Sequence, residues 1–158
     1  MRTVYRVLGW LLAIEVLIQA ASVTYAVFGL GRWIQNGGVL DKSVMESDVS
    51  AFPQEVGFMV HGLNGEMVIP VLALLLLVVA FFAKVPRGLA LAGGVVGLVA
   101  LQVVLGMLSQ GLPGLGILHG ANALLLFVAA VMAARAAGTP AAGPVGVATG
   151  RHSAATPI

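Results

Sequence analysis

The chain lacks cysteine and carries few charges. None of its 158 residues is a cysteine, and only 9% are Asp, Glu, Lys or Arg. The absence of thiols excludes disulfides, thiolate metal sites, iron–sulfur clusters and covalent c-type haem attachment. The scarcity of charge, together with 59% hydrophobic residues and a mean hydropathy of +1.04, excludes a soluble fold of this size. The composition therefore predicts an integral membrane protein.

Four continuous apolar runs are long enough to cross a bilayer. A hydrocarbon core of about 30 Å needs about 20 apolar residues in a helix. The first run exceeds the apolar region of a signal peptide, so we expect it to be retained as a helix. We predict an all-α, integral membrane four-helix bundle over residues 1–136. Its helices are expected at 7–30, 58–82, 89–108 and 115–134.

The basic residues predict the orientation of these helices. In a four-helix topology six of them fall on one side, namely Arg2, Arg6, Lys84, Arg87, Arg135 and Arg151. Only Arg32 and Lys42 fall on the other. By the positive-inside rule both termini are cytoplasmic and the loop 31–57 is outside. These charges flank the helices and form no basic surface, so the partner they predict is the lipid bilayer and not nucleic acid.

The segments outside the four runs differ in character. In the outer loop, Ser43 and Glu46 have the spacing of a capping box, which predicts a short helix beginning there. The tail 137–158 is mostly Ala, Gly, Pro, Thr and Val without amphipathic periodicity, so we expect cytoplasmic disorder. The tail holds His152, to which we assign no role. Arg outnumbers Lys six to two, a bias resembling that of high-GC genomes. Together with the four apolar runs, this predicts a multi-pass protein of a bacterial cell membrane.

A short motif occurs twice at the start of an apolar run. HGLNG begins at His61 and HGANA begins at His119. The run before each copy contains a single glutamine, Gln19 or Gln102. The chain is therefore predicted to consist of two repeated helix pairs, which would set both its architecture and its chemistry. With the predicted orientation, both histidines lie at a similar depth near the outer leaflet.

Polar side chains within apolar helices are costly in lipid, so they usually face the bundle interior. Asn64 and Asn122 follow their histidines by three residues and share a helix face with them. Glu66 follows His61 by five residues and is expected to point elsewhere, toward the first helix or a partner. For Glu15 and Glu66 we favour structural or interface roles, and scattered methionines are attributed to packing.

Two inward histidines at matching depth suit the two axial positions of one b-type haem. The predicted metal ligands are His61 and His119. Gly62 and Gly120 would let the macrocycle approach the backbone, while Gln19, Gln102, Asn64 and Asn122 would donate hydrogen bonds around it. A simpler interpretation stays open, in which the histidines are interfacial and the amides hold helices together through hydrogen bonds.

The third and fourth runs resemble part of a known enzyme family. The sequence LQVVLG at 101–106, followed after a turn by LHGANALL at 118–125, resembles a helix pair of haem A synthases. Those enzymes are built from two four-helix halves, each with histidines on its second and fourth helices around a haem. The fourth run is also similar to that of a group of small four-helix membrane proteins. The resemblance covers about residues 7–136 and implies His61 and His119 as haem ligands.

The chain departs from the family pattern at positions that matter for activity. Haem A synthases have a glutamate one turn before the second-helix histidine and an arginine just after it. Gly57 and Gly62 stand at these positions here, and the second four-helix half is absent from this sequence. Hydroxylation of a haem methyl group is therefore not carried over.

Three functional hypotheses follow from these observations. The first is a cytochrome-like haem b protein for electron transfer or haem carriage, because two protein ligands leave no open coordination site. The second is a cofactor-free accessory subunit of a larger membrane complex. The third is a quinone-reactive or haem-handling enzyme with a redox partner. Separately, Gly93 and Gly97 form a close-packing motif that would suit either a homodimer or contacts within the bundle.

Overall fold

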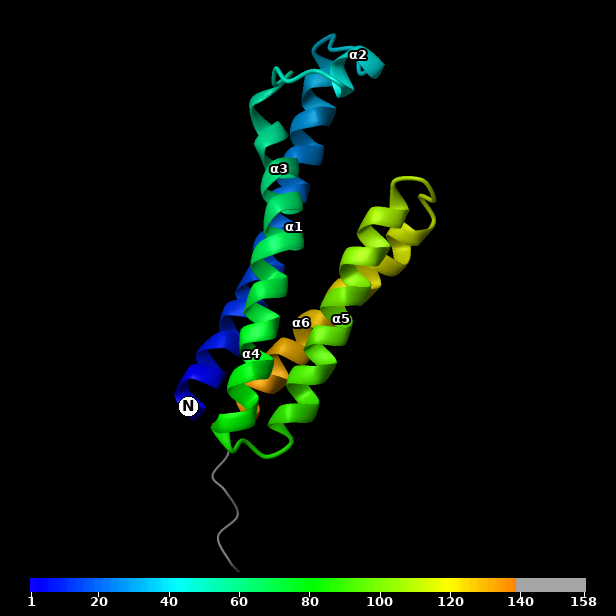
Figure 1. Ribbon diagram of the computed structural model, residues 1–158. Helices are drawn as coiled ribbons and strands as arrows, with labels where there is room; N and C mark the ends of the chain where they lie inside the picture. The colour runs from blue at the N-terminus through cyan, green and yellow to red at the C-terminus, as the bar shows by residue number, and fades with distance from the viewer. Residues whose placement is uncertain (139–158) are drawn as a thin grey trace, which may run out of the picture.

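The computed structural model describes residues 1–138, and every regular element among them is helical (Figure 1). The elements are α1 (Arg2–Gln35), α2 (Lys42–Met45), η1 (Pro53–Glu55), α3 (Val56–Leu63), η2 (Asn64–Val68), α4 (Ile69–Ala83), α5 (Gly88–Ser109) and α6 (Leu115–Ala136). Because η1, α3, η2 and α4 follow one another without a break, they act as one long helix. Four helices in this part of the chain are therefore long and apolar enough to cross a membrane.

The helices extend beyond the predicted apolar runs. Residues 31–35 continue α1 and residues 53–57 begin the next span, so the outer connection is shorter than the predicted loop 31–57. With 34 residues, α1 is about 51 Å long and exceeds a hydrocarbon core of about 30 Å. Hydropathy marks only the part of a helix that suits lipid, whereas backbone hydrogen bonding continues past it. Of the predicted tail 137–158, residues 139–158 lie outside the described part of the chain.

The short helix in the outer connection has its N-cap at Asp41, two residues before the predicted capping residue Ser43. The Asp41 carboxylate accepts a hydrogen bond from the Val44 N–H at 3.0 Å. The Ser43 hydroxyl donates to the same carboxylate at 2.6 Å. These hydrogen bonds, that of Ser43 first, lower the pKa of the Asp41 carboxyl below its ordinary value. The predicted capping box is therefore wrong, because Asp41, and not Ser43, caps the helix by accepting the Val44 N–H.

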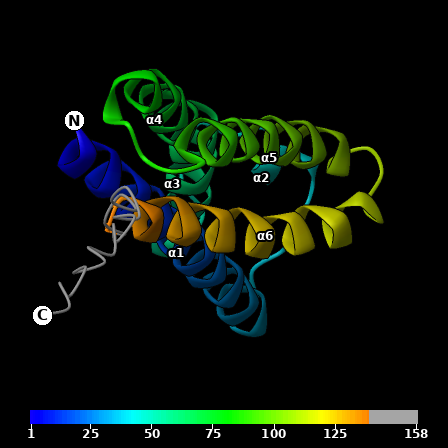
Figure 2. The same ribbon diagram turned by 90° about the horizontal axis from the view of Figure 1, so that it is seen from below.

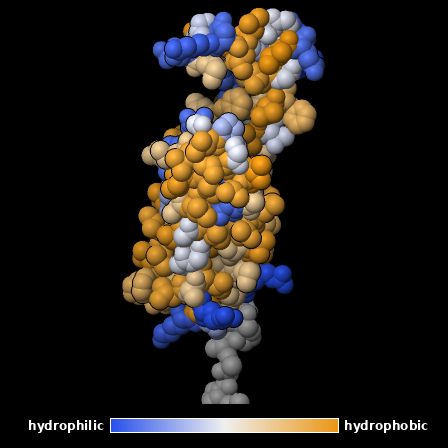
Figure 3. All heavy atoms as spheres, turned by 90° about the vertical axis from the view of Figure 1, so that its right-hand side faces the viewer, coloured by the Kyte–Doolittle hydropathy of each residue, from blue (hydrophilic) through white to orange (hydrophobic). Residues whose placement is uncertain are grey.

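The four long helices surround a common axis. Helix α1 packs against α6 and against α3 and α4, while α5 packs against α4 and α6. Thus α1 lies diagonally opposite α5, and the α3–α4 helix lies diagonally opposite α6 (Figure 2). A broad apolar belt separates hydrophilic groups at the two ends of the molecule (Figure 3), as expected for a bundle whose outer surface faces lipid.

The apolar core fills the half of the bundle near the α4–α5 turn. Tyr5 is fully buried there, and its hydroxyl donates to the Gly88 carbonyl oxygen at 2.8 Å. Gly9 allows α1 and α6 to cross closely, because a Cβ at this position would lie 2.8 Å from the Ala134 backbone nitrogen. Toward the other end, the α1 and α3–α4 pair diverges from the α5 and α6 pair (Figure 1). This divergence leaves the second half of the bundle for the polar residues.

Candidate functional site

The two repeated histidines face one another across the bundle. His61 projects from α3 and His119 from the diagonally opposite α6. Their ring centroids are 6.1 Å apart, with an angle of 59° between the ring planes. Both side chains are part-buried. The pairing that the repeat predicted is therefore present in the geometry.

Each histidine is held by the backbone of the glutamine helix that precedes it. The Nδ1 of His61 donates to the Gln19 carbonyl oxygen at 3.1 Å, and the Nδ1 of His119 donates to the Gln102 carbonyl oxygen at 3.1 Å. A carbonyl can only accept, so these bonds place the proton of each neutral ring on Nδ1 and leave Nε2 with a free lone pair. Both histidines therefore have the tautomer that presents Nε2 to a metal.

The Nε2 atoms of the two histidines differ in their hydrogen-bond partners. The Nε2 of His119 accepts from the Gln102 side-chain amide at 3.1 Å, and the Gln102 Oε1 accepts from Asn122 Nδ2 at 2.6 Å. By contrast, the Nε2 of His61 has no hydrogen-bond partner among residues 1–138. His61 is thus available to a ligand, whereas His119 becomes available once the Gln102 amide turns away.

A cavity of about 730 Å³ adjoins both histidines. This volume lies within the range of about 300–1,000 Å³ that is usual for small-molecule and cofactor sites. Gln19, Gln102, Gly62 and Gly120, which the sequence predicted for the site, all line it. A Cβ at Gly62 or Gly120 would meet nothing within 4 Å, so both glycines border open space. The walls are otherwise mainly apolar, contributed by residues such as Val16, Leu17, Phe58, Val99, Val103, Leu126 and Phe127.

The predicted asparagines support the walls and do not line the cavity. Asn122 is buried, with 4% of its surface exposed, and it also donates to the Leu98 carbonyl oxygen at 3.0 Å. Asn64 is buried as well and donates to Glu15 Oε2 at 2.7 Å. Glu15 therefore has a structural contact within the bundle, joining α1 to η2. Both asparagines hold neighbouring helices together.

A π-helical turn follows His61 and was not predicted. In η2 the Ile69 N–H bonds the Asn64 carbonyl oxygen, five residues back. Such turns widen a helix by about one residue and often occur at functional sites. Glu66, which lies within this turn, is exposed and also lines the cavity. The available signal was Pro70, which cannot bond the Glu66 carbonyl in an α-helix.

Two buried polar atoms beside the histidines have no partner among the described residues. They are Gln19 Nε2, a donor, and Asn122 Oδ1, an acceptor. A buried unpaired donor costs about 1–3 kcal/mol, so the Gln19 amide suits a ligand that brings an acceptor into the cavity. The histidine tautomers, the ring separation, the cavity volume and this unpaired donor all fit a metal-centred planar ligand between the two rings.

The described residues thus define a membrane-type four-helix bundle with a paired-histidine cavity. A scan against protein-family models gave no match, and neither did the comparisons with curated proteins and with solved structures. The function is therefore inferred from the residues of the cavity themselves.

Exchanging Gln102 for leucine is expected to destabilise the protein, and the same exchange at Gln19 is not. Leucine at 102 leaves His119 Nε2 and Asn122 Nδ2 without their side-chain partner, which should cost roughly 2 kcal/mol or more. Gln19→Leu removes an amide nitrogen that already lacks a partner and leaves its backbone carbonyl in place. Unfolding in detergent, followed by the fluorescence of Trp10 and Trp33, measures the difference. Equal losses in the two variants would contradict the asymmetry of the two halves.

Proposed function

We propose that this protein binds one haem b through His61 and His119. The observation that supports this most directly is the separation of the two rings. An imidazole nitrogen bonds a transition metal at roughly 2 Å, and the ring centre lies about 1 Å further back, so two ligands on opposite sides of one metal have centres about 6 Å apart. The observed 6.1 Å matches this separation.

The protein's own hydrogen bonds prepare the two ligands. The carbonyl oxygens of Gln19 and Gln102 accept from Nδ1, which orients each ring and makes its Nε2 more basic. Ligation at His119 requires the Gln102 amide to leave Nε2, at a cost of about 1 kcal/mol for one hydrogen bond. The amide can then donate toward the cavity together with the unpaired Nε2 of Gln19. Gly62 and Gly120 leave space next to the ligands.

His61 and His119 would together hold the haem, and the bound group would then supply one-electron transfer. The apolar cavity walls would exclude water and thereby influence its reduction potential. These features favour electron transfer or haem carriage, with a quinone or a protein as redox partner. A role as a stand-alone enzyme is less well supported, because no open coordination position is left for a substrate.

The proposed placement in the membrane follows from charge and repetition. With Arg2, Lys84, Arg87 and Arg135 on the cytoplasmic side, both termini face the cytoplasm and the histidines lie toward the outer leaflet of a bacterial cell membrane. The equivalent contacts of His61 with Gln19 and of His119 with Gln102 support the origin of the bundle in two repeated helix pairs. The haem would then lie between the repeats, within reach of an outer redox partner.

A cofactor-free accessory subunit is the second candidate. Apolar side chains in the connection beyond the membrane-length helices support it, since Met45 and Val49 are 75% and 77% exposed. Such side chains suit a protein partner outside the bilayer. Purification in mild detergent distinguishes the candidates, because this role predicts stoichiometric recovery of a larger complex without haem.

Titration of the purified protein with haemin tests the proposed function. We expect saturation at one haem per chain and a low-spin, six-coordinate absorption spectrum in both redox states. Absence of a Soret band shift on addition of haemin, or a purely five-coordinate spectrum, would overturn the proposal.

A further inference from the structure

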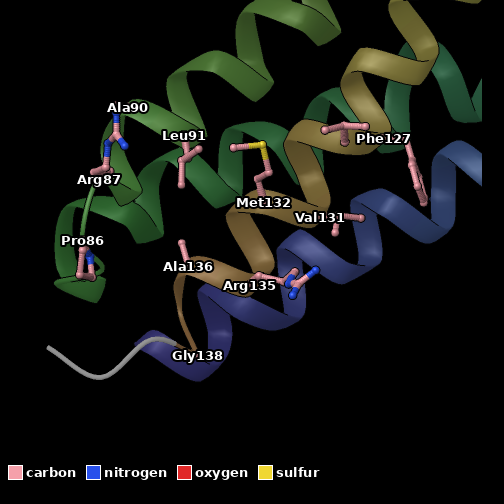
Figure 4. A pocket seen from close by; sticks show the side chains of 11 residues that line it. Pro86, Arg87, Ala90, Leu91, Phe127, Val131, Met132, Arg135, Ala136 and Gly138 are labelled. Atoms are coloured by element: carbon pink, nitrogen blue, oxygen red, sulfur yellow. The ribbon is translucent and has the colours of Figure 1, made fainter.

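A second hollow lies at the opposite end of the bundle, between the ends of α5 and α6 near the α4–α5 turn (Figure 4). This groove has a volume of about 1090 Å³. Figure 4 shows Arg87 on its α5 side and Arg135 on its α6 side, with Leu91 and Met132 between them. The other walls include Phe127, Val128 and Val131. The groove therefore combines a hydrocarbon surface with one cation on each side.

The charges around this groove are of one sign. The sequence contains no Asp or Glu after Glu66. In residues 1–138 the one ion pair is Lys42–Glu46 in the outer connection, so no carboxylate in that part of the chain neutralises Arg87 or Arg135. Both arginines are exposed. Their guanidinium groups suit a phosphate, which they can bind through paired hydrogen bonds.

The turn between α4 and α5 contains a second cation in the same backbone conformation as Arg87. Arg87 has φ = 57°, in the left-handed region that favours glycine. Lys84, in the same turn, has φ = 49° but does not line the groove. The turn thus holds two cations in the same unusual conformation, and only one of them reaches the groove. This pair provides a matched control for charge and for backbone strain.

We infer that the groove binds an anionic phospholipid, whose negatively charged head group is attracted by Arg87 and Arg135 and whose acyl chain lies along Leu91, Val128 and Met132. Two arginines at the end of membrane-length helices lie where lipid head groups lie, and basic pockets between transmembrane helices recognise anionic head groups. The apolar walls match an acyl chain, which a free phosphate lacks. This inference does not depend on the proposed haem, because the two hollows share only Phe127 and neither arginine lines the histidine cavity.

Native mass spectrometry of the full chain in detergent tests the inference. The probes are phosphatidylglycerol, phosphatidylcholine with the same acyl chains, and inorganic phosphate. A basic side chain near a membrane surface contributes a factor of about 5 in binding. We therefore expect Arg87→Gly and Arg135→Gln each to weaken phosphatidylglycerol binding about fivefold, and the double variant about 30-fold, to the level of phosphatidylcholine. Lys84→Gly should leave binding unchanged.

A variant that keeps both charges tests the acyl-chain part of the groove. Ala90 lines the groove and is exposed, so Ala90→Phe should fold and reduce phosphatidylglycerol binding by obstruction. Equal binding of the two lipids, an equal loss in Lys84→Gly, or displacement of the lipid by inorganic phosphate at equal concentration would overturn the inference. A dimer that disappears in the double variant without any lipid adduct would identify a second copy of the chain as the occupant and also overturn it.

Discussion

Alanine at either His61 or His119 is expected to abolish six-coordinate haem binding. Each imidazole would supply one of the two bonds to the metal, and residues 1–138 contain no group of three or more His, Cys, Asp or Glu side chains that could hold a metal ion instead. Changes to groups that merely orient a metal ligand already cost about 10–100-fold in affinity, so loss of the ligand itself should cost at least about 100-fold. Haemin titration followed by absorption measures both the affinity and the coordination number.

The third histidine provides a control for this experiment. His152→Ala makes the same substitution outside the described residues and should leave the spectrum unchanged. The two site variants should also differ from one another without haem. His119→Ala deprives the Gln102 amide of its acceptor, whereas the Nε2 of His61 has no partner to lose, so His119→Ala should be the less stable of the two. A six-coordinate spectrum that survives both substitutions would rule out this ligand pair.

Leucine at Gly62 or Gly120 is expected to prevent haem binding without unfolding the bundle. A Cβ at either position meets nothing within 4 Å, so the cavity can accept the larger side chain. Replacing a helical glycine also gains about 0.5–1 kcal/mol of helix stability. In the loaded protein the same side chains would occupy the volume next to the two ligands. We therefore expect haem affinity to fall at least about 100-fold, as when a ligand is lost, while the melting temperature of the haem-free protein stays the same or rises.

Gly97 supplies the matched position for this test. A Cβ there also meets nothing within 4 Å, but Gly97 does not line the cavity. Gly97→Leu should therefore raise helix stability to a similar degree and leave haem binding intact. Haemin titration and thermal unfolding of the three variants, in the same detergent, separate the two effects. Normal haem affinity in Gly62→Leu and Gly120→Leu would place the ligand elsewhere.

Gly97 also belongs to the close-packing motif of α5. Gly93, Gly94 and Gly97 have no atom within 4 Å of an added Cβ, so they do not serve the close helix contacts within the described bundle. Of the two uses that the sequence left open, contact inside the bundle is therefore not the one observed. A homodimer through this face stays a prediction.

The class of fold was predictable because it depends on sums over many residues. Hydropathy averaged over about 20 positions located all four membrane-length helices, and errors at single positions had no effect. The ends of α1 at Arg2 and Gln35 were missed for the same reason. A helix stops where its hydrogen bonding stops, and no average of side-chain polarity records that point.

Only the part of the site that follows from the repeated motif could be predicted from the sequence. The motif at His61 and at His119 predicted that the two rings face each other. The glutamines were expected to act through their side chains, whereas the contact common to both halves is made by their backbone carbonyls. The π-helical turn that begins at Asn64 was not predicted, because it departs from the regular helix on which the face of Glu66 was predicted. The double contact of Gln102 with His119 was equally hidden, since it depends on a distance between two helices that no sequence pattern measures.

The uneven filling of the bundle has a consequence for its motions. Large side chains such as Tyr5, Leu12 and Leu76 are fully buried, and they tie the helices together toward the α4–α5 turn, whereas a cavity replaces such contacts around the histidines. Opening free energies within one protein range from nearly zero to the global value, according to local packing. We therefore expect the half of the bundle near the α4–α5 turn to open less readily than the half around the histidines. A ligand can then enter between the diverging helix pairs while the well-packed half keeps its structure.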